Sequence, residues 1–142
     1  MSTAAVEVHG VTRERDWMVW AGWLLSVLAA SIFVLSAYMK LTRQAGYVAE
    51  MERLGYSPDV LTGLALLQST CLALYLFPRT SVLGVVLLTG YLGGAISSYV
   101  RLGDNLFANT FQVSTALLLW GGLYLREERL WSLLPLRRGH IR

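Results

Sequence analysis

Five polar side chains lie inside or beside long apolar stretches, and they are the candidates for chemistry. They are Lys40, Gln68, Tyr99, Asn109 and Gln112. Amine, amide and phenol groups form hydrogen bonds, and within a membrane such groups are costly unless they have a partner. Together they would suit a pocket for a small polar headgroup, such as a quinone ring or a lipid headgroup.

Gln68 lies near the middle of its apolar stretch and has two interpretations. The first is a hydrogen bond between helices, worth about 0.6 to 2 kcal/mol. The second is a binding site. Helical side chains lean toward the helix N-terminus, so Gln68 and Tyr99, on helices that run in opposite directions, lean toward each other. Ser36 and Ser97 lie at the same depth as this pair.

Other kinds of chemistry lack the residues that they need. Cys71 is the single cysteine, which excludes an internal disulfide, and His9 and His140 lie in polar tails where they cannot clamp a haem. The apolar stretches hold no carboxylate pair, no Ser/His/Asp set and no charged residue. We therefore expect no catalytic residue, no metal and no intrinsic cofactor, and a proton-coupled transporter is disfavoured.

The elements that must position these residues are four uncharged stretches of about the length that spans a bilayer. They are residues 17–39, 60–78, 80–100 and 105–125. With 55% hydrophobic and 15% charged residues and a mean hydropathy of +0.50, the chain differs from soluble proteins. We predict an all-α, integral membrane four-helix bundle over residues 17–125. The alternative, a soluble protein with buried helices, would need four unusually long apolar helices in succession.

Residues 41–59 separate the first two predicted spans. Tyr47, Val48, Met51 and Leu54 recur there at helical spacing, which predicts a short amphipathic helix. It would lie on the outer membrane surface or cap the bundle.

The two tails and the loops set the predicted orientation. Residues 1–16 form a polar N-terminal tail that we expect to fray, and residues 126–142 form a basic tail suited to an anionic lipid surface. Eight Lys and Arg residues lie on the side of both tails and the second loop, against four on the opposite side. Because basic residues favour the cytoplasmic side, both termini are predicted to be cytoplasmic. Trp17, Trp20 and Trp23 would lie in the headgroup layer at that side.

Small residues recur every fourth position in the third predicted span. Gly90, Gly94 and Ser98 share one helix face, where a second helix could approach closely. This face is the predicted helix-packing surface, either within the bundle or toward another membrane subunit.

The chain resembles the DoxX-like family of small bacterial membrane proteins. The resemblance lies in residues 76–84 (LFPRTSVLG), 88–95 (LTGYLGGA) and 100–104 (VRLGD), and in 119–126 (LWGGLYLR) and 133–138 (LLPLRR). It implies a four-helix membrane bundle in the bacterial inner membrane. The family's name comes from a link with the oxidation of quinols and sulfur compounds.

Two positions depart from the pattern that we associate with this family. Gln68 stands where members often have a glutamate, and Tyr99 where they often have a histidine. Both replacements remove a group that titrates near physiological pH. The departure favours an accessory role over a catalytic one.

Three hypotheses about function follow from the sequence. The leading one is an accessory or assembly subunit of a larger membrane redox complex, near its quinone site, with other membrane subunits and the lipid bilayer as partners. The second is a quinone-linked membrane oxidoreductase, an enzyme in which Gln68 and Tyr99 orient a bound quinone. The third, a small-solute transporter, is disfavoured because the inner half of each span is nearly all apolar.

Overall fold

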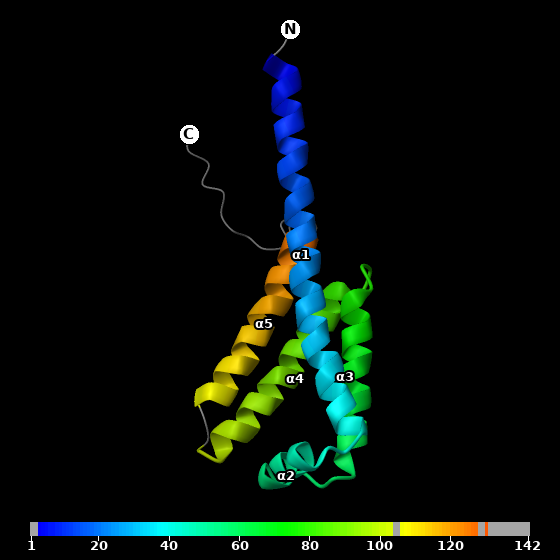
Figure 1. The fold of residues 1–142 in the computed structure, drawn as a ribbon, viewed down its shortest axis with the longest axis vertical. Helices are drawn as coiled ribbons and strands as arrows, with labels where there is room; N and C mark the ends of the chain where they lie inside the picture. The colour runs from blue at the N-terminus through cyan, green and yellow to red at the C-terminus, as the bar shows by residue number, and fades with distance from the viewer. Residues whose placement is uncertain (1–2, 104–105, 128–129, 131–142) are drawn as a thin grey trace.

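Four long helices run up and down beside one another, and a short fifth helix lies across one end of them (Figure 1). The computed structural model describes residues 3–103, 106–127 and 130, with side chains from residue 16 onward. Its helices are α1 (Thr3–Leu41), α2 (Ala45–Arg53), α3 (Val60–Leu76), α4 (Ser81–Arg101) and α5 (Leu106–Arg126). The described residues form an all-α fold, as the sequence predicts.

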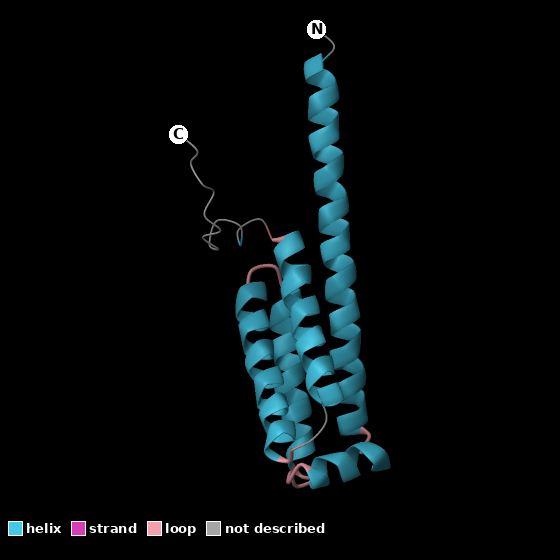
Figure 2. Ribbon diagram, turned by 90° about the vertical axis from the view of Figure 1, so that its left-hand side faces the viewer, coloured by secondary structure: helices cyan, strands magenta, loops and turns pink. Residues whose placement is uncertain are grey.

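The long helices form a ring in which each one packs against two others. α1 packs against α3 and α5, and α4 packs against the same two helices from the other side. Figure 2 shows the four helices side by side, with α1 extending well beyond the ends of its neighbours. This ring brings one face of every long helix to a shared interior.

α1 begins at Thr3, so the polar segment that we expected to fray is helical from that residue. Helix nucleation is the costly step, and extending an existing helix adds one hydrogen bond for each residue that is fixed. The segment Thr3–Asp16 continues a long apolar helix and contains Ala, Glu and Arg, which favour helices. The helix therefore extends into the polar part of the chain.

Two helices are long and apolar enough to cross a membrane. They are Asp16–Leu41, within α1, and Ser81–Arg101, which is α4, whereas Val60–Leu76 is a shorter apolar helix. Apolar side chains cover the outer surface of the ring, among them Leu24, Leu66 and Leu117, each more than 60% exposed. Such a surface suits lipid better than water. That all four long helices span the membrane stays a prediction.

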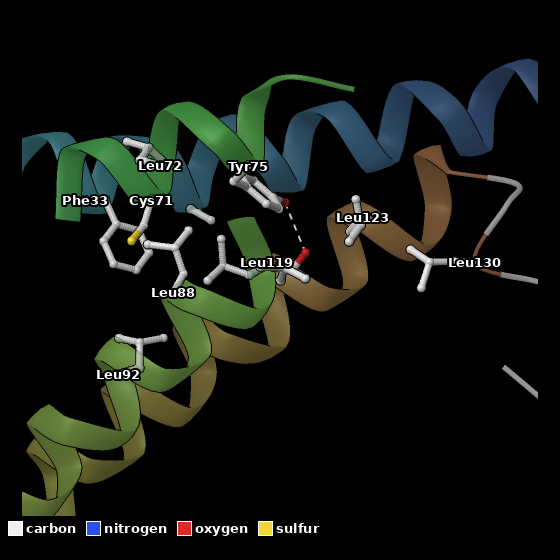
Figure 3. Close-up of a cluster of buried hydrophobic side chains, with 11 residues drawn as sticks. Phe33, Cys71, Leu72, Tyr75, Leu88, Leu92, Leu119, Leu123 and Leu130 are labelled. Atoms are coloured by element: carbon white, nitrogen blue, oxygen red, sulfur yellow. Dashed lines mark hydrogen bonds between the residues drawn. The ribbon is translucent and has the colours of Figure 1, made fainter. Parts of the chain in front are cut away.

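The interior of the ring is an apolar cluster centred on α3, α4 and α5 (Figure 3). Tyr75, Leu88 and Leu119 are fully buried in it. Gly84 lets α4 approach α3, because a Cβ at this position would overlap the backbone of Tyr75. Gly22 and Gly122 make the corresponding close contact between α1 and α5.

α1 ends in a Schellman motif, the backbone arrangement that commonly stops a helix. The amide of Arg43 donates to the carbonyl of Lys40, and the amide of Gln44 donates to that of Met39, both at 3.3 Å. Arg43 takes the left-handed conformation that the motif requires, with φ of 48°. α2 ends in the same motif, with Gly55 at the left-handed position.

α2 caps the end of the bundle, which is one of the two placements that its amphipathic pattern allows. Met51 and Leu54 are buried against Leu61 of α3, and Tyr56 and Tyr99 pack on the same cluster. The guanidinium of Arg101, at the end of α4, donates to the carbonyl of Leu54 at 3.0 Å. α2 is thereby tied to both α3 and α4.

Candidate functional site

Lys40 and Gln68 meet inside the bundle, close to the end that α2 caps. The last turn of α1 carries Lys40, and the middle of α3 carries Gln68. The Lys40 side chain is 2% exposed, and its Nζ donates to Gln68 Oε1 at 2.6 Å and to Ser36 Oγ at 2.7 Å. Ser36 lies one helical turn before Lys40, so α1 itself supplies one of the two acceptors.

The amide of Gln68 also bonds back to α1. Its Nε2 donates to the backbone carbonyl of Phe33 at 2.6 Å. A carbonyl oxygen has two lone pairs and can accept this bond in addition to its helical one. Gln68, which is fully buried, therefore uses both ends of its amide to join α3 to α1.

Two tyrosine rings complete the surroundings of Lys40. The Nζ lies 5.4 Å from the ring centroid of Tyr47, on α2, and 5.5 Å from that of Tyr91, on α4. These distances are within the range of cation–π attraction. Burial raises the pKa of the Tyr47 phenol, although a hydrogen bond with Ser36 acts in the opposite direction. Tyr47 therefore stays neutral and supplies no counter-charge.

The Lys40 centre, by which we mean Lys40, Ser36, Gln68, Tyr47 and Tyr91, thus holds an amine whose two hydrogen-bond acceptors are neutral. A protonated amine has three donors, and Ser36 and Gln68 accept two of them. A carbonyl or anionic group is the kind of partner that accepts a third bond from this amine. The arrangement suits binding and orientation, and it contains no nucleophile paired with a base.

The other three predicted site residues lie on α4 and α5. Tyr99 packs on the cluster of Met51, Leu54 and Leu61 under α2. Asn109 and Gln112 lie on α5, and none of the hydrogen bonds given for the described residues joins them to Lys40 or Gln68. The Oδ1 atom of Asn109 is buried and has no hydrogen-bond partner in the part of the chain that the structure describes.

Sequence reasoning missed Tyr47 and Tyr91 as site residues. Tyr47 belongs to the apolar face of the amphipathic segment, and Tyr91 lies among glycines in an apolar helix. The sequence around each tyrosine contains no pattern that indicates a binding site. Only the arrangement of α2 and α4 around the end of α1 brings both rings to Lys40.

The predicted packing face of α4 divides into a covered part and an open part. Ser98 is buried, because the Tyr56 hydroxyl lies 2.7 Å from its Oγ. Gly90 and Gly94 are exposed, and within the described part of the chain no heavy atom lies within 4 Å of a Cβ placed on either one. The close helix contacts of this chain use Gly84, together with Gly22 and Gly122.

A second polar centre lies at the opposite end of the bundle. The Tyr75 hydroxyl bonds with Ser26 Oγ at 2.9 Å and donates to the Leu119 carbonyl at 3.0 Å, the bond drawn in Figure 3. The Arg126 guanidinium lies 4.7 Å from the ring centroids of both Trp23 and Tyr75. We call Arg126, Trp23 and Tyr75 the Arg126 centre.

The end of α3 explains why an arginine lies there. Pro78 has no amide hydrogen, so the helix stops and leaves carbonyls of its last turn without helical partners. Thr80 Oγ1 donates to the Leu74 carbonyl at 2.9 Å, and Arg126 Nη2 donates to the Tyr75 carbonyl at 2.6 Å. Two side chains thus replace the missing backbone donors.

Among the described residues, no group of three or more His, Cys, Asp or Glu side chains is placed to hold a metal ion. Cys71 is a free, buried thiol of the apolar cluster.

Comparison with known proteins identifies the family. The model of the DoxX-like family matches residues 24–122, which include all of α2, α3 and α4 and the whole Lys40 centre. Neither the curated proteins nor the solved structures contain a match to this chain. The family match covers well over half of the sequence and agrees with the apolar helices of the fold. The chain belongs to the DoxX-like family.

Proposed function

We propose that this chain is an accessory or assembly subunit of a larger membrane redox complex. In this proposal it spans the bacterial inner membrane four times, with both termini in the cytoplasm. Membership of a family of membrane proteins and the two helices long enough to cross a bilayer support a membrane location. The redox partner is the part of the proposal that rests on the family's link with quinol oxidation.

The open face of α4 is the observation that carries the proposal. Gly90 and Gly94 lie four residues apart on a membrane-length helix, and the bundle does not use them for its own close contacts. In lipid, helices associate through small residues that allow their backbones to approach. The acceptors around Lys40 are meanwhile bonded within the chain, which favours a packing role over a catalytic one.

Gentle purification from the native membrane, with identification of co-purifying chains by mass spectrometry, tests this role. We expect a defined set of membrane subunits, which the double variant Gly90→Leu/Gly94→Leu loses. Gly63→Leu is the matched control, because Gly63 is an exposed glycine of α3 that also has open space around it. A wild-type chain that purifies alone from several mild detergents contradicts the proposal.

The second candidate function is a quinone-linked oxidoreductase, and the Lys40 centre is the observation that favours it. A buried amine beside an amide, a serine hydroxyl and two aromatic rings offers donors and ring surfaces that suit a quinone headgroup. In this hypothesis, Tyr91 orients the quinone together with Gln68, a role that the sequence suggested for Tyr99.

Extraction of the purified protein with organic solvent, followed by assay for quinone, separates the two candidates. The oxidoreductase hypothesis predicts about one bound quinone per chain, and its loss in Lys40→Met and Gln68→Ala. Tyr38→Phe is a suitable control, because Tyr38 is an exposed residue of α1. A quinone-free wild-type protein would remove this candidate.

A further inference from the structure

The Arg126 centre holds a guanidinium whose hydrogen bonds are incomplete. Arginine carries five N–H donors. Nη2 donates to the Tyr75 carbonyl, whereas Nη1 is buried and has no hydrogen-bond partner among the described residues. Buried donors in proteins almost always have a partner, so an unpaired one indicates an acceptor beyond the described residues.

The position of the Arg126 guanidinium limits which chemical groups can be that acceptor. The close contact of Gly22 with the backbone of Arg126 places the end of α5 beside α1 just before Trp23. From there α1 continues past the other helices, as Figure 2 shows. Trp17 and Trp20, which are 60% and 71% exposed, project from this extension. Exposed tryptophans of a membrane helix lie at the level of the lipid headgroups.

Charge and geometry favour a phosphate group. The planar guanidinium fork matches the oxygens of a phosphate, and headgroup phosphates are concentrated at this depth of a bilayer. Arg79, in the turn between α3 and α4, adds a second positive charge at the same end of the bundle. Among the described acidic residues, Asp16 is next to Trp17 in sequence and Glu127 is next to Arg126. The Glu127 carboxylate interacts electrostatically with the guanidinium, but neither residue is bonded to Nη1. Glu128 lies outside the described residues.

We propose that the Arg126 centre binds phosphate, with Nη1 donating to a phosphate oxygen and the Trp23 ring stacked on the guanidinium. An anionic phospholipid headgroup and a free phosphate ion are the two sources of this chemistry. The bound group would complete the hydrogen bonds of an arginine that already ties α5 to the end of α3. The site lies at the opposite end of the bundle from the Lys40 centre, and it does not depend on the proposed redox partner.

Native mass spectrometry of the full chain in detergent micelles tests this site with two lipids, dioleoylphosphatidylglycerol and dioleoylphosphatidylcholine. We expect wild-type protein to retain the anionic lipid about fivefold more tightly, the effect of one arginine near an anionic headgroup. Arg126→Gln should abolish the preference. Arg43→Gln is the matched control, because it removes an exposed arginine charge at the opposite end of the bundle.

Two further experiments, a second variant and a competition with phosphate, complete the test. Trp23→Leu keeps the bond from Arg126 to α3 but removes the stacked ring, so it should weaken lipid retention even if Arg126→Gln fails to fold. Inorganic phosphate at millimolar concentration should displace the lipid if the site also accepts free phosphate, and should leave it bound if the site requires the headgroup. Equal retention of both lipids by wild-type protein overturns the proposal. So does a preference that survives in both Arg126→Gln and Trp23→Leu.

Discussion

The two ends of the bundle each hold a basic side chain among aromatic rings, but they use it differently. Lys40 is 2% exposed, and both of its hydrogen bonds go to side chains of α1 and α3. Arg126 is partly exposed and bonds to a backbone carbonyl at the end of α3, and its Nη1 has no partner within the described part of the chain. α2 covers the first end, whereas at the second end α1 extends alone past its neighbours.

The two basic residues, Lys40 and Arg126, thus have different roles at the two ends of the bundle. At the α2 end, the partners of Lys40 are fixed before any ligand arrives, so the group joins helices. At the other end, the Arg126 guanidinium donates to a carbonyl that lacks a helical partner because Pro78 ends α3. We infer that its remaining N–H donors bond to a bound group. A buried polar group whose partners all lie within the chain stabilises the fold, and one with a missing partner indicates a site.

The largest expected effect comes from the α3–α4 contact beside the Arg126 centre. Gly84→Ala should lower the free energy of unfolding by about 3 kcal/mol or more, because the added Cβ overlaps the backbone of Tyr75. Thermal unfolding in detergent would measure the loss. Gly63→Ala, in open space on α3, should have little effect, and an equally harmless Gly84→Ala would show that the helices do not approach as described.

At the Lys40 centre, Gln68→Leu should cost about 2 kcal/mol, because it removes an acceptor from a buried amine. Lys40→Met in the same chain should recover at least half of this loss, since the amine that needs a partner is then gone. A double-mutant cycle of unfolding free energies gives the coupling between the two residues. Additive losses would mean that the two side chains do not interact.

At the Arg126 centre, Arg126→Gln should cost about 1.5 kcal/mol, because it leaves the Tyr75 carbonyl without its charged donor. Arg126→Lys, which keeps a charged donor, should cost less. Unfolding of both variants without added lipid separates this structural role from lipid binding. An unchanged stability in Arg126→Gln would show that the end of α3 does not need the arginine.

The smallest effect is a gain in stability next to the Lys40 centre. Arg43→Gly should add about 0.5 kcal/mol, because glycine adopts the left-handed backbone conformation without the strain that a Cβ brings. Arg43→Ala, which removes the side chain but keeps the Cβ, is the control and should give no gain. A gain in both variants would attribute the effect to the arginine charge instead.

Much of the fold follows from local patterns in the sequence. The stretches 60–78, 80–100 and 105–125 begin and end within a few residues of α3, α4 and α5, and the stretch 17–39 lies inside the longer α1. The amphipathic segment forms α2. The polar residues before position 17 were wrongly expected to fray, since hydropathy carries no information about whether a helix continues into polar sequence. For the site, the structure brings Lys40 and Gln68 together, and the predicted part of Tyr99, Asn109 and Gln112 in a pocket stays a prediction.

The sequence by itself determined the helical class and the family, and it predicts the depth of each polar residue, because these depend on composition and spacing along the chain. Only the tertiary structure decided which faces meet. It placed Tyr47 and Tyr91 around Lys40, closed the ring at Gly84 rather than at Gly90 and Gly94, and put Arg126 against the end of α3. The rotation of one helix against another is set by contacts between residues far apart in sequence, which no local pattern encodes.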